Sequence, residues 1–314
     1  MRGIRFIPDN TNINFVKLRL ITFALSALMV LATASGFFSK GINYGIDFSG
    51  GTSVLIKTPG KADLESLRAT VGSLGLGDVS LQEFGSPQDI RIRIEQQKAT
   101  DSMDANEAQS AAVKKIKDAL DNDIVISEVE SVGPTVGEEL IDSGIWAVLC
   151  ALLAMAIYIW IRFEWQFGIC ALLALTHDCV SIMALYVFTA LEFNLDAIVA
   201  ILITAGYSIN DTVVVYDRIR ENLRKYKAMP IPELINKSIN ETLSRTVLTS
   251  GTTLMALLSL YYFGGQVIAN YSLPIICGVA VGTYSSICIA APLLLFFNIK
   301  ARKETKEARS EIIS

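Results

Sequence analysis

The residues best suited to chemistry are charged side chains embedded in apolar stretches. Asp211 lies in one such stretch, about two helical turns before Arg218. A charged Asp at a helix centre costs roughly 2.5–3.5 kcal/mol to insert into a membrane, so its presence there indicates a function. Ser208, Asp211 and Thr212 share one helical face by their i, i+3 and i+4 spacing, and Val215 continues that face. This polar stripe is expected to face other helices or water. The alternative is that Asp211 only extends to the nearby membrane surface.

Arg245 lies at the start of the next apolar stretch, at the membrane side where the Asp211 stretch ends. Arg245 precedes Thr249 and Thr252 on one face, at a depth comparable with that of Asp211. An ion pair between the two helices is therefore feasible. Proton binding by Asp211 would release Arg245, and proton loss would restore the pair. Changes in protonation would therefore drive a movement of the helices. One proton moving through about 100 mV supplies about 2.3 kcal/mol. The alternative is that Arg245 is a basic anchor at the cytoplasmic surface.

Asp178 is a third candidate, because it lies next to His177 near the middle of another apolar stretch. Adjacent helical residues point about 100° apart, so the two cannot face one partner together. We predict Asp178 as the relay, and His177 stays open between a relay and a packing role. The predicted ion-coupling residues are Asp211, Arg245, Asp178, Ser208, Thr212 and Thr249.

The common enzymatic and metal-binding motifs are missing from this sequence or fall where they could not function. The sequence has no GxxxxGK[ST] phosphate loop, and its single His excludes HExxH and paired-His metal sites. A Ser-His-Asp triad would need His177, which the helix prediction buries in the membrane. The GLGD string at residues 75–78 matches the GxGD of intramembrane aspartyl proteases but falls in a predicted turn outside the spans. We expect no enzyme activity, no metal and no cofactor.

The elements that must position these residues are membrane helices. The chain has 314 residues, of which 52% are hydrophobic and 18% charged, against about 25% charged in soluble domains. Its apolar residues gather in stretches of about 20, the length that crosses a bilayer core. All five cysteines fall in these stretches and are expected to be packing residues. The predicted spans are 17–38, 141–161, 166–188, 195–216, 246–264 and 272–297.

Basic residues set the predicted orientation. They gather before the first span, at Arg162, in segment 217–245 and in the tail 298–314, while 189–194 and 265–271 have none. The positive-inside rule therefore places both termini in the cytoplasm and segment 39–140 outside. The predicted parts are an N-terminus with the first span (1–38), an outside domain (39–140), the remaining spans (141–297) with a cytoplasmic loop (217–245), and the tail.

Segment 39–140 has the pattern of a small α+β domain. Strands are predicted over 52–57, 79–84, 90–95 and 124–132, and helices over 61–74 and 104–120, with Asp104 as an N-cap. The order β-α-β-β-α-β predicts a ferredoxin-like domain inserted in a six-helix membrane bundle. Acidic residues outnumber basic ones in this segment, which disfavours nucleic-acid binding and suits protein contact or solubility.

Two further features have structural interpretations. Gly278 and Gly282 form a GxxxG pattern that allows close helix packing. Residues 232–243 have an amphipathic pattern, which predicts a helix lying on the inner membrane surface.

Three strings resemble one family. GIDFSGGT at 45–52 resembles the GIDFxGG signature of the SecD/SecF family, in which Gly50 and Gly51 are expected at backbone turns. Residues 206–222 resemble the fourth helix of its SecF branch, and 238–253 resemble the entry to the fifth. The resemblance covers essentially the whole chain and places it in the SecF branch, within the wider RND superfamily.

The resemblance implies a function in protein export. SecF proteins pair with SecD, each giving six helices to one unit, and the pair joins the SecYEG channel in the inner membrane, often with YajC and YidC. The unit uses a proton gradient, or sodium in some bacteria, to promote late export of unfolded polypeptide. The family's ion-transport Asp and Arg match Asp211 and Arg245.

Three functions are compatible with this sequence. The first is an ion-coupled export subunit, for which Asp211 is essential. The second is a scaffold of the translocation channel that moves no ion and tolerates loss of both Asp211 and Arg245. The third is half of an RND-type exporter of small molecules or lipids, which a deep apolar pocket in the outside domain would favour.

Overall fold

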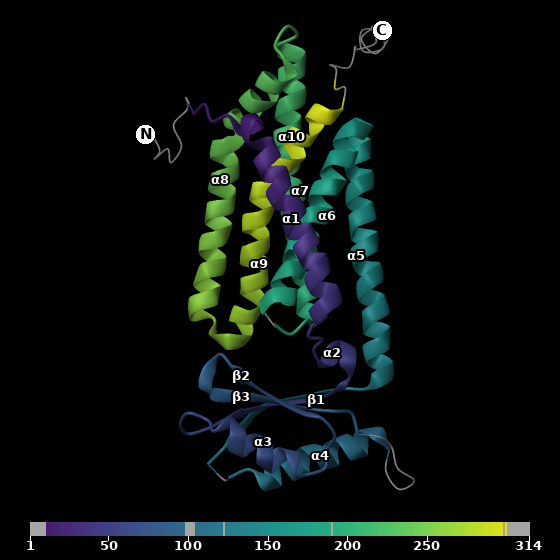
Figure 1. The fold of residues 1–314 in the computed structure, drawn as a ribbon, viewed down its shortest axis with the longest axis vertical. Helices are drawn as coiled ribbons and strands as arrows, with labels where there is room; N and C mark the ends of the chain where they lie inside the picture. Colours follow the sequence, from purple (N-terminus) through teal and green to yellow (C-terminus); the bar gives the residue numbers. More distant parts are fainter. Residues whose placement is uncertain (1–10, 98–103, 122, 190, 298, 300–314) are drawn as a thin grey trace, which may run out of the picture.

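The computed structural model describes the chain except residues 1–10, 98–103, 122, 190, 298 and 300–314. A bundle of long helices carries a small α/β domain at one end, as Figure 1 shows. Within the described residues, six helices are long and apolar enough to cross a membrane, which confirms the predicted spans. The bundle helices are α1 (Phe15–Lys40), α5 (Pro134–Arg162), α6 (Trp165–Thr189), α7 (Leu195–Lys225), α8 (Ile231–Phe263) and α9 (Gly265–Ser285). The last span continues through the π-helical turn η1 (Ser286–Ala290), α10 (Ala291–Leu293) and the 3-10 turn η2 (Leu294–Phe296).

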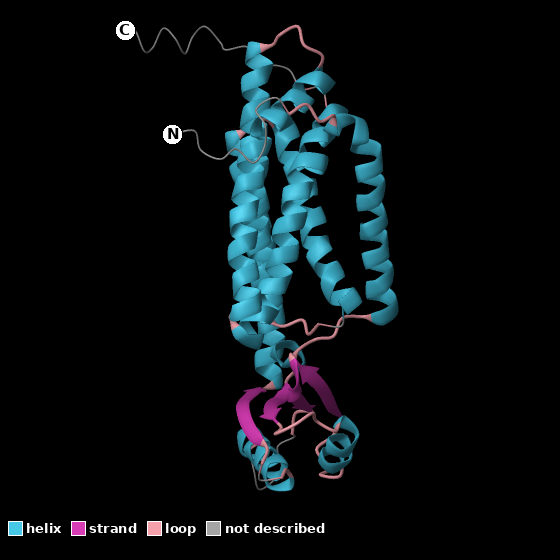
Figure 2. Ribbon diagram, turned by 90° about the vertical axis from the view of Figure 1, so that its left-hand side faces the viewer, coloured by secondary structure: helices cyan, strands magenta, loops and turns pink. Residues whose placement is uncertain are grey.

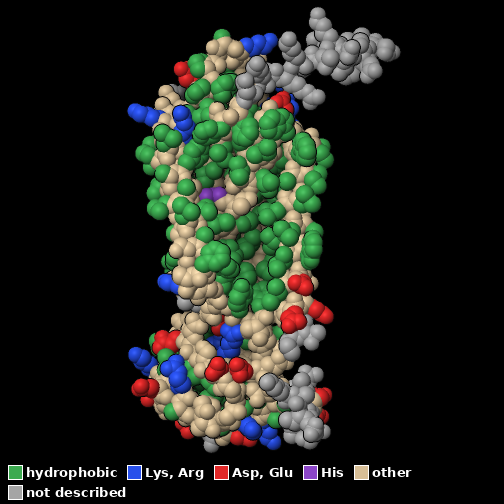
Figure 3. All heavy atoms as spheres, turned by 45° about the vertical axis from the view of Figure 1, so that its right-hand side comes forward, with side chains coloured by type: hydrophobic (Ala, Val, Ile, Leu, Met, Phe, Trp, Pro, Cys, Tyr) green, Lys and Arg blue, Asp and Glu red, His purple; other side chains and the backbone are tan. Residues whose placement is uncertain are grey.

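The outer surface of the bundle is apolar. Large side chains such as Leu20, Trp160 and Phe263 are more than half exposed. Figure 3 shows hydrophobic side chains covering the bundle, with charged residues gathered at its two ends. A soluble protein rarely exposes an apolar surface this continuous, so the surface fits a lipid environment.

The segment 217–245, predicted as a loop, is largely helical. α7 runs on to Lys225 and α8 begins at Ile231, which leaves only residues 226–230 as the connection. The predicted surface helix over 232–243 is the first part of α8. Its apolar side chains Leu234 and Ile235 are buried in one cluster with Ile219 of α7. The amphipathic stripe thus packs against a neighbouring helix rather than on lipid, which corrects the prediction.

The small domain has the predicted element order. It consists of β1 (Gly51–Lys57), α3 (Leu64–Gly72), β2 (Val79–Phe84), β3 (Ser86–Ile94), α4 (Ala105–Ala119) and β4 (Val125–Val132). The strands form one antiparallel sheet in the order β2-β3-β1-β4. Both helices cover the sheet face that points away from the bundle (Figure 2). Val54, Ile92 and Ile116 are among the fully buried residues between sheet and helices.

Local caps explain where the two helices begin. The side chain of Asp104 accepts a hydrogen bond from the Glu107 backbone N–H at 2.7 Å, which confirms the predicted N-cap. The other helix starts at Leu64 rather than at residue 61, because Asp63 caps it by accepting from the backbone N–H groups of Glu65 and Ser66.

A short helix, α2 (Ile46–Ser49), lies between sheet and bundle and occupies the GIDFSGG segment. Gly50 and Gly51, which follow it, have φ values of 68° and 110°, so the expected turns are confirmed. A Cβ on Gly51 would lie 2.5 Å from the carbonyl oxygen of Ile94. The chain can therefore enter β1 here only without a side chain.

Candidate functional site

The predicted polar stripe of α7 faces the interior of the bundle. Ser208, Asp211 and Thr212 are 1–2% exposed, and Val215 is fully buried. Since α7 packs against α6, α8 and α9, the stripe contacts protein on each side. Asp211 therefore faces neighbouring helices and does not extend to the membrane surface, which was the alternative.

Asp211 is incompletely satisfied within the bundle. Its Oδ2 is buried and has no hydrogen-bond partner. Three α8 residues lie around the carboxyl group: Arg245, Thr249 and Ser250. Arg245 is exposed and acts on Asp211 as a nearby charge, without a hydrogen bond between the two side chains. The site therefore brings the predicted Asp211, Arg245 and Thr249 together, with the Asp–Arg pair open.

The α8 hydroxyl groups near Asp211 already have partners. Thr249 donates to the Arg245 carbonyl at 3.1 Å, and Ser250 donates to the Thr246 carbonyl at 2.8 Å. Ser250 also meets Thr283 of α9 at 2.6 Å. These hydroxyl groups can turn toward Asp211 only by giving up other contacts, so the carboxyl oxygen stays free in this state.

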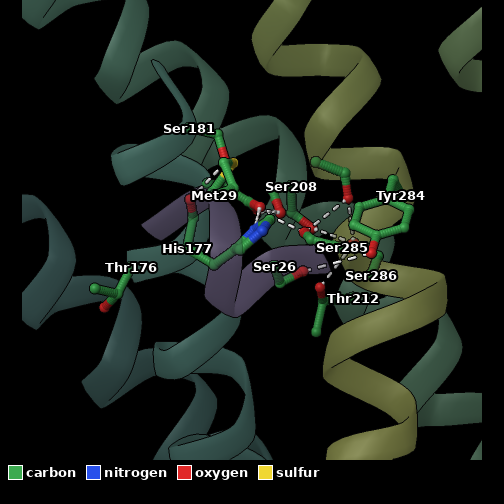
Figure 4. A network of polar contacts seen from close by, with 12 residues as sticks. Ser26, Met29, Thr176, His177, Ser181, Ser208, Thr212, Tyr284, Ser285 and Ser286 are labelled. Carbon is green, nitrogen blue, oxygen red and sulfur yellow. Dashed lines mark hydrogen bonds and ion pairs between the residues drawn. The ribbon is translucent and has the colours of Figure 1, made fainter. Parts of the chain in front are cut away.

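Asp178 accepts hydrogen bonds from a second group of polar side chains, and Figure 4 shows three of that group, His177, Ser208 and Ser285, turned toward one another. It is completely buried, and its Oδ2 accepts from Ser208 at 2.5 Å and from Ser285 at 2.7 Å. Its Oδ1 lies 3.0 Å from His177 Nδ1. An ionised carboxylate accepts only, so this contact requires a proton on Nδ1. Asp178 thereby connects α6, α7 and α9, while Asp211 remains under-bonded one turn from Ser208.

The network continues to the last span. Thr212 and Ser286 are 2.9 Å apart, and Ser286 also donates to the Ser208 carbonyl at 3.2 Å. Ser286 begins the π-helical turn η1, a local irregularity that often accompanies functional sites. Sequence reasoning missed Ser285 and Ser286; the available signal was a pair of hydroxyl residues inside an otherwise apolar span. It also missed that His177 contacts Asp178 itself.

Close packing of α9 on α7 makes these contacts possible. A Cβ on Gly278 would lie 1.9 Å from Thr204 Oγ1, and one on Gly282 would lie 3.0 Å from Ser208 Cβ. The GxxxG prediction of close helix approach is therefore confirmed. This approach lets Ser286, which follows α9, bond to Thr212 and to the Ser208 carbonyl of α7.

A second polar region lies between the small domain and the bundle. A cavity of about 340 Å³ there is lined in part by carboxylates and, among the described residues, by one cation, Arg91. Arg91 pairs with Glu192 at 3.0 Å. The acidic lining residues are Asp47, Glu83, Glu128, Glu130, Glu192 and Asp196. The partial desolvation of Glu130, with a smaller contribution from Glu128, raises the pKa of Glu130 above its ordinary 4.5.

Two family models match this chain. The C-terminal model of the protein export membrane proteins SecD/SecF matches residues 112–300, which include the polar network. The SecD/SecF GG motif matches residues 35–58, which include α2. The chain belongs to the SecD/SecF family.

Relatives and solved structures agree with this assignment. The protein translocase subunit SecF of Rickettsia rickettsii is 41% identical over 309 residues, which cover 97% of this chain and 98% of that protein. The subunit SecF of Cereibacter sphaeroides is 40% identical over 313 residues, covering 98% and 96%. A crystal structure of SecDF, a translocon-associated membrane protein from Thermus, matches with a TM-score of 0.83 and 33% identity.

The SecDF proteins are longer than this chain. The match covers 93% of this chain but 39% of the Thermus SecDF chain, and likewise 39% of the Brucella abortus translocase subunit SecDF. In these proteins a SecF-like part is joined to a further part, which indicates a SecD-type partner for this chain. The expected resemblance to SecF is confirmed, and the chain is an integral membrane protein of the protein-translocase type.

Proposed function

We propose that this chain, together with a SecD-type partner, uses a proton or sodium gradient to promote export of unfolded polypeptide through the SecYEG channel. The observation that carries the proposal is the Asp211 carboxyl group, which is buried on α7 beside α8 residues with one oxygen unbonded. A buried ionised carboxylate is costly unless a cation compensates it. Arg245 is the nearby cation, and it is not held by a hydrogen bond to Asp211.

The ionised and protonated states of Asp211 would favour different positions of α8. When ionised, Asp211 attracts Arg245 and draws the inner part of α8 toward α7. When protonated, it loses that attraction and can donate its own proton to a neighbouring oxygen. Thr249 and Ser250 are the hydroxyl groups beside it. A gradient supplying about 2.3 kcal/mol per charge at 100 mV is large enough to shift such an equilibrium about fiftyfold.

Asp178 is proposed as the relay neighbour of Asp211. Ser208 donates to Asp178 and lies one helical turn before Asp211 on the same buried face of α7, which supports Asp178 as that neighbour. Thr212 joins the same stripe to the π-helical turn η1 through Ser286. No metal or cofactor is part of the proposal; the coupling ion is H⁺ or Na⁺.

The surrounding architecture supports export over the alternatives. The strand order β2-β3-β1-β4 supports our inference that the outside domain is ferredoxin-like. The cavity against that domain has six carboxylates in its lining and so is not the deep apolar pocket that a small-molecule or lipid exporter would favour. We place the chain in the inner membrane with both termini in the cytoplasm, beside SecD and SecYEG, with YajC and YidC as further partners and no nucleic-acid ligand.

The test is reconstitution of the chain with its SecD-type partner and SecYEG in vesicles under an imposed gradient. Asp211→Asn should abolish gradient-dependent stimulation of export and reduce ion flux to the level of vesicles without the pair. Asp217→Asn is the matched control, because Asp217 lies on the same helix in a half-exposed ion pair with Arg162. Repeating the flux with and without Na⁺ at fixed pH identifies the ion.

Full stimulation by Asp211→Asn would defeat the proposal. The scaffold alternative makes the opposite prediction for a double variant. If Asp211→Asn combined with Arg245→Gln retains full stimulation and co-purifies with the partner, the chain assembles the channel without moving an ion.

A further inference from the structure

The GIDFSGG segment joins the outside domain to the start of α7. The backbone N–H of Gly45 donates to the Phe193 carbonyl at 3.0 Å, and the N–H of Phe193 donates to the Asn43 carbonyl at 2.8 Å. Phe48 is buried and packs on Phe193 with ring centroids 5.6 Å apart. The segment that follows α1 is therefore fixed to the connection between α6 and α7.

Asp47 makes the most specific contact in this joint. Its Oδ2 accepts a hydrogen bond at 3.0 Å from the backbone N–H of Leu195, the first residue of α7. The sequence-adjacent cap residue, Asn194, makes no side-chain capping bond. The first N–H groups of a helix have no partner within the helix and favour a negative charge. Asp47 thus caps α7 from 148 residues away.

The other side of α2 is attached to the sheet. Arg93 of β3 donates to the Tyr44 carbonyl at 2.6 Å and also hydrogen-bonds the Ser49 hydroxyl. Arg91, two residues earlier on the same strand, pairs with Glu192 just before α7. β3 therefore contacts both α2 and the chain that leads into α7.

We propose that Asp47 is a positioning residue that couples α7 to the outside domain, so that a displacement of α7 moves the sheet. α7 is one helix of 31 residues without proline, and it carries Asp211 about 24 Å from Leu195 at 1.5 Å per residue. A helix of this kind moves as a rigid element. The inference rests on the proposed function, because it assigns the route by which an ion-driven change at Asp211 reaches the exported polypeptide.

A purely structural cap is the competing explanation, and the test separates the two. Asp47→Ala removes the cap, whereas Asp47→Asn keeps an acceptor oxygen for the Leu195 N–H. Asp63→Ala is the matched control, because Asp63 caps α3 of the same outside domain through two backbone N–H groups. Each variant is reconstituted with the SecD-type partner and SecYEG, and ion flux and gradient-dependent export are measured on the same vesicles.

We expect Asp47→Ala to keep ion flux within twofold of wild type. The same variant should reduce the gradient-dependent stimulation of export at least tenfold. Asp47→Asn should recover most of the stimulation, and Asp63→Ala should leave it unchanged. Wild-type stimulation in Asp47→Ala would overturn the proposal. Equal losses in Asp47→Ala and Asp63→Ala, or loss of flux together with stimulation, would also overturn it, because either result indicates general damage.

A second measurement does not depend on ion movement. Hydrogen exchange is compared between wild type and Asp211→Asn, each with Asp47 or with Ala at that position. Asp211→Asn should change exchange at residues 45–50 and 91–93 only when Asp47 is present. No change there in either background would overturn the coupling. Absence of wild-type ion flux would instead defeat the proposed function, while this exchange result would still decide the role of Asp47.

Discussion

Gly278→Ala tests the contact on which the buried network depends. The new Cβ would lie 1.9 Å from Oγ1 of Thr204 and 2.9 Å from both its Cβ and its Cγ2. Rotation of the Thr204 side chain moves the γ atoms, but its Cβ stays in place at 2.9 Å. Thr204 is 1% exposed, so no free space is available beside it. The helices α7 and α9 must therefore separate.

The expected magnitude follows from overpacking in well-filled interiors. Forcing an extra methyl into such a contact costs typically about 1–3 kcal/mol. Separation of the last span from α7 would also lengthen the bonds from Ser286 to Thr212 and to the Ser208 carbonyl. We therefore expect Gly278→Ala to destabilise the bundle by about 2–3 kcal/mol, at the upper part of that range.

The assay is equilibrium unfolding of the purified chain with its partner in detergent micelles. Gly206→Ala is the matched control, because a Cβ at that α7 position meets nothing within 4 Å. It should be neutral or slightly stabilising, since Ala is about 0.5–1 kcal/mol better than Gly within a helix. Thr204→Gly combined with Gly278→Ala should restore stability in a double-mutant cycle. Equal stability of Gly278→Ala and wild type would refute the packing argument.

Two further predictions concern the polar groups. Asp178→Ala leaves the Ser208 and Ser285 hydroxyls without their acceptor and should lower the free energy of unfolding by about 2–4 kcal/mol. Asp178→Asn keeps an acceptor and should lower it less. Thermal unfolding of both variants checks this, and equal melting temperatures for the two variants would contradict the network. The pKa of Glu130 is raised in the folded protein, so its carboxyl loses its proton less readily there than when unfolded. Stability should therefore fall as pH rises from about 4.5 through the folded pKa, and Glu130→Gln should remove that part of the pH dependence; parallel melting curves of wild type and variant across pH 4–8 would contradict the assignment.

Much of the architecture is a local property of the sequence. Apolar stretches of bilayer length and alternating strand patterns identify the spans and the strands without reference to distant residues. The spacing of Ser208, Asp211 and Thr212 similarly places them on one helical face. Caps such as Asp104 are also local, because donor and acceptor lie within three residues of each other.

The prediction for 217–245 failed because local pattern does not identify the partner of an amphipathic face. Leu234 and Ile235 form an apolar stripe that suits lipid and protein equally well. The extended end of α7, with Ile219, offers a protein surface, so the stripe packs there and α8 becomes continuous.

Only the tertiary structure decided which polar groups meet. Ser285 lies 107 residues from Asp178, and Leu195 lies 148 residues from Asp47, so no sequence spacing links either pair. The sequence by itself determined that a carboxyl group lies within a membrane helix. The packing of α7 and α9 on α6 decided that Asp178 is saturated with donors, while the packing of α8 on α7 leaves Asp211 with an unbonded oxygen. Hydrogen bonds depend on distances that only helix packing sets.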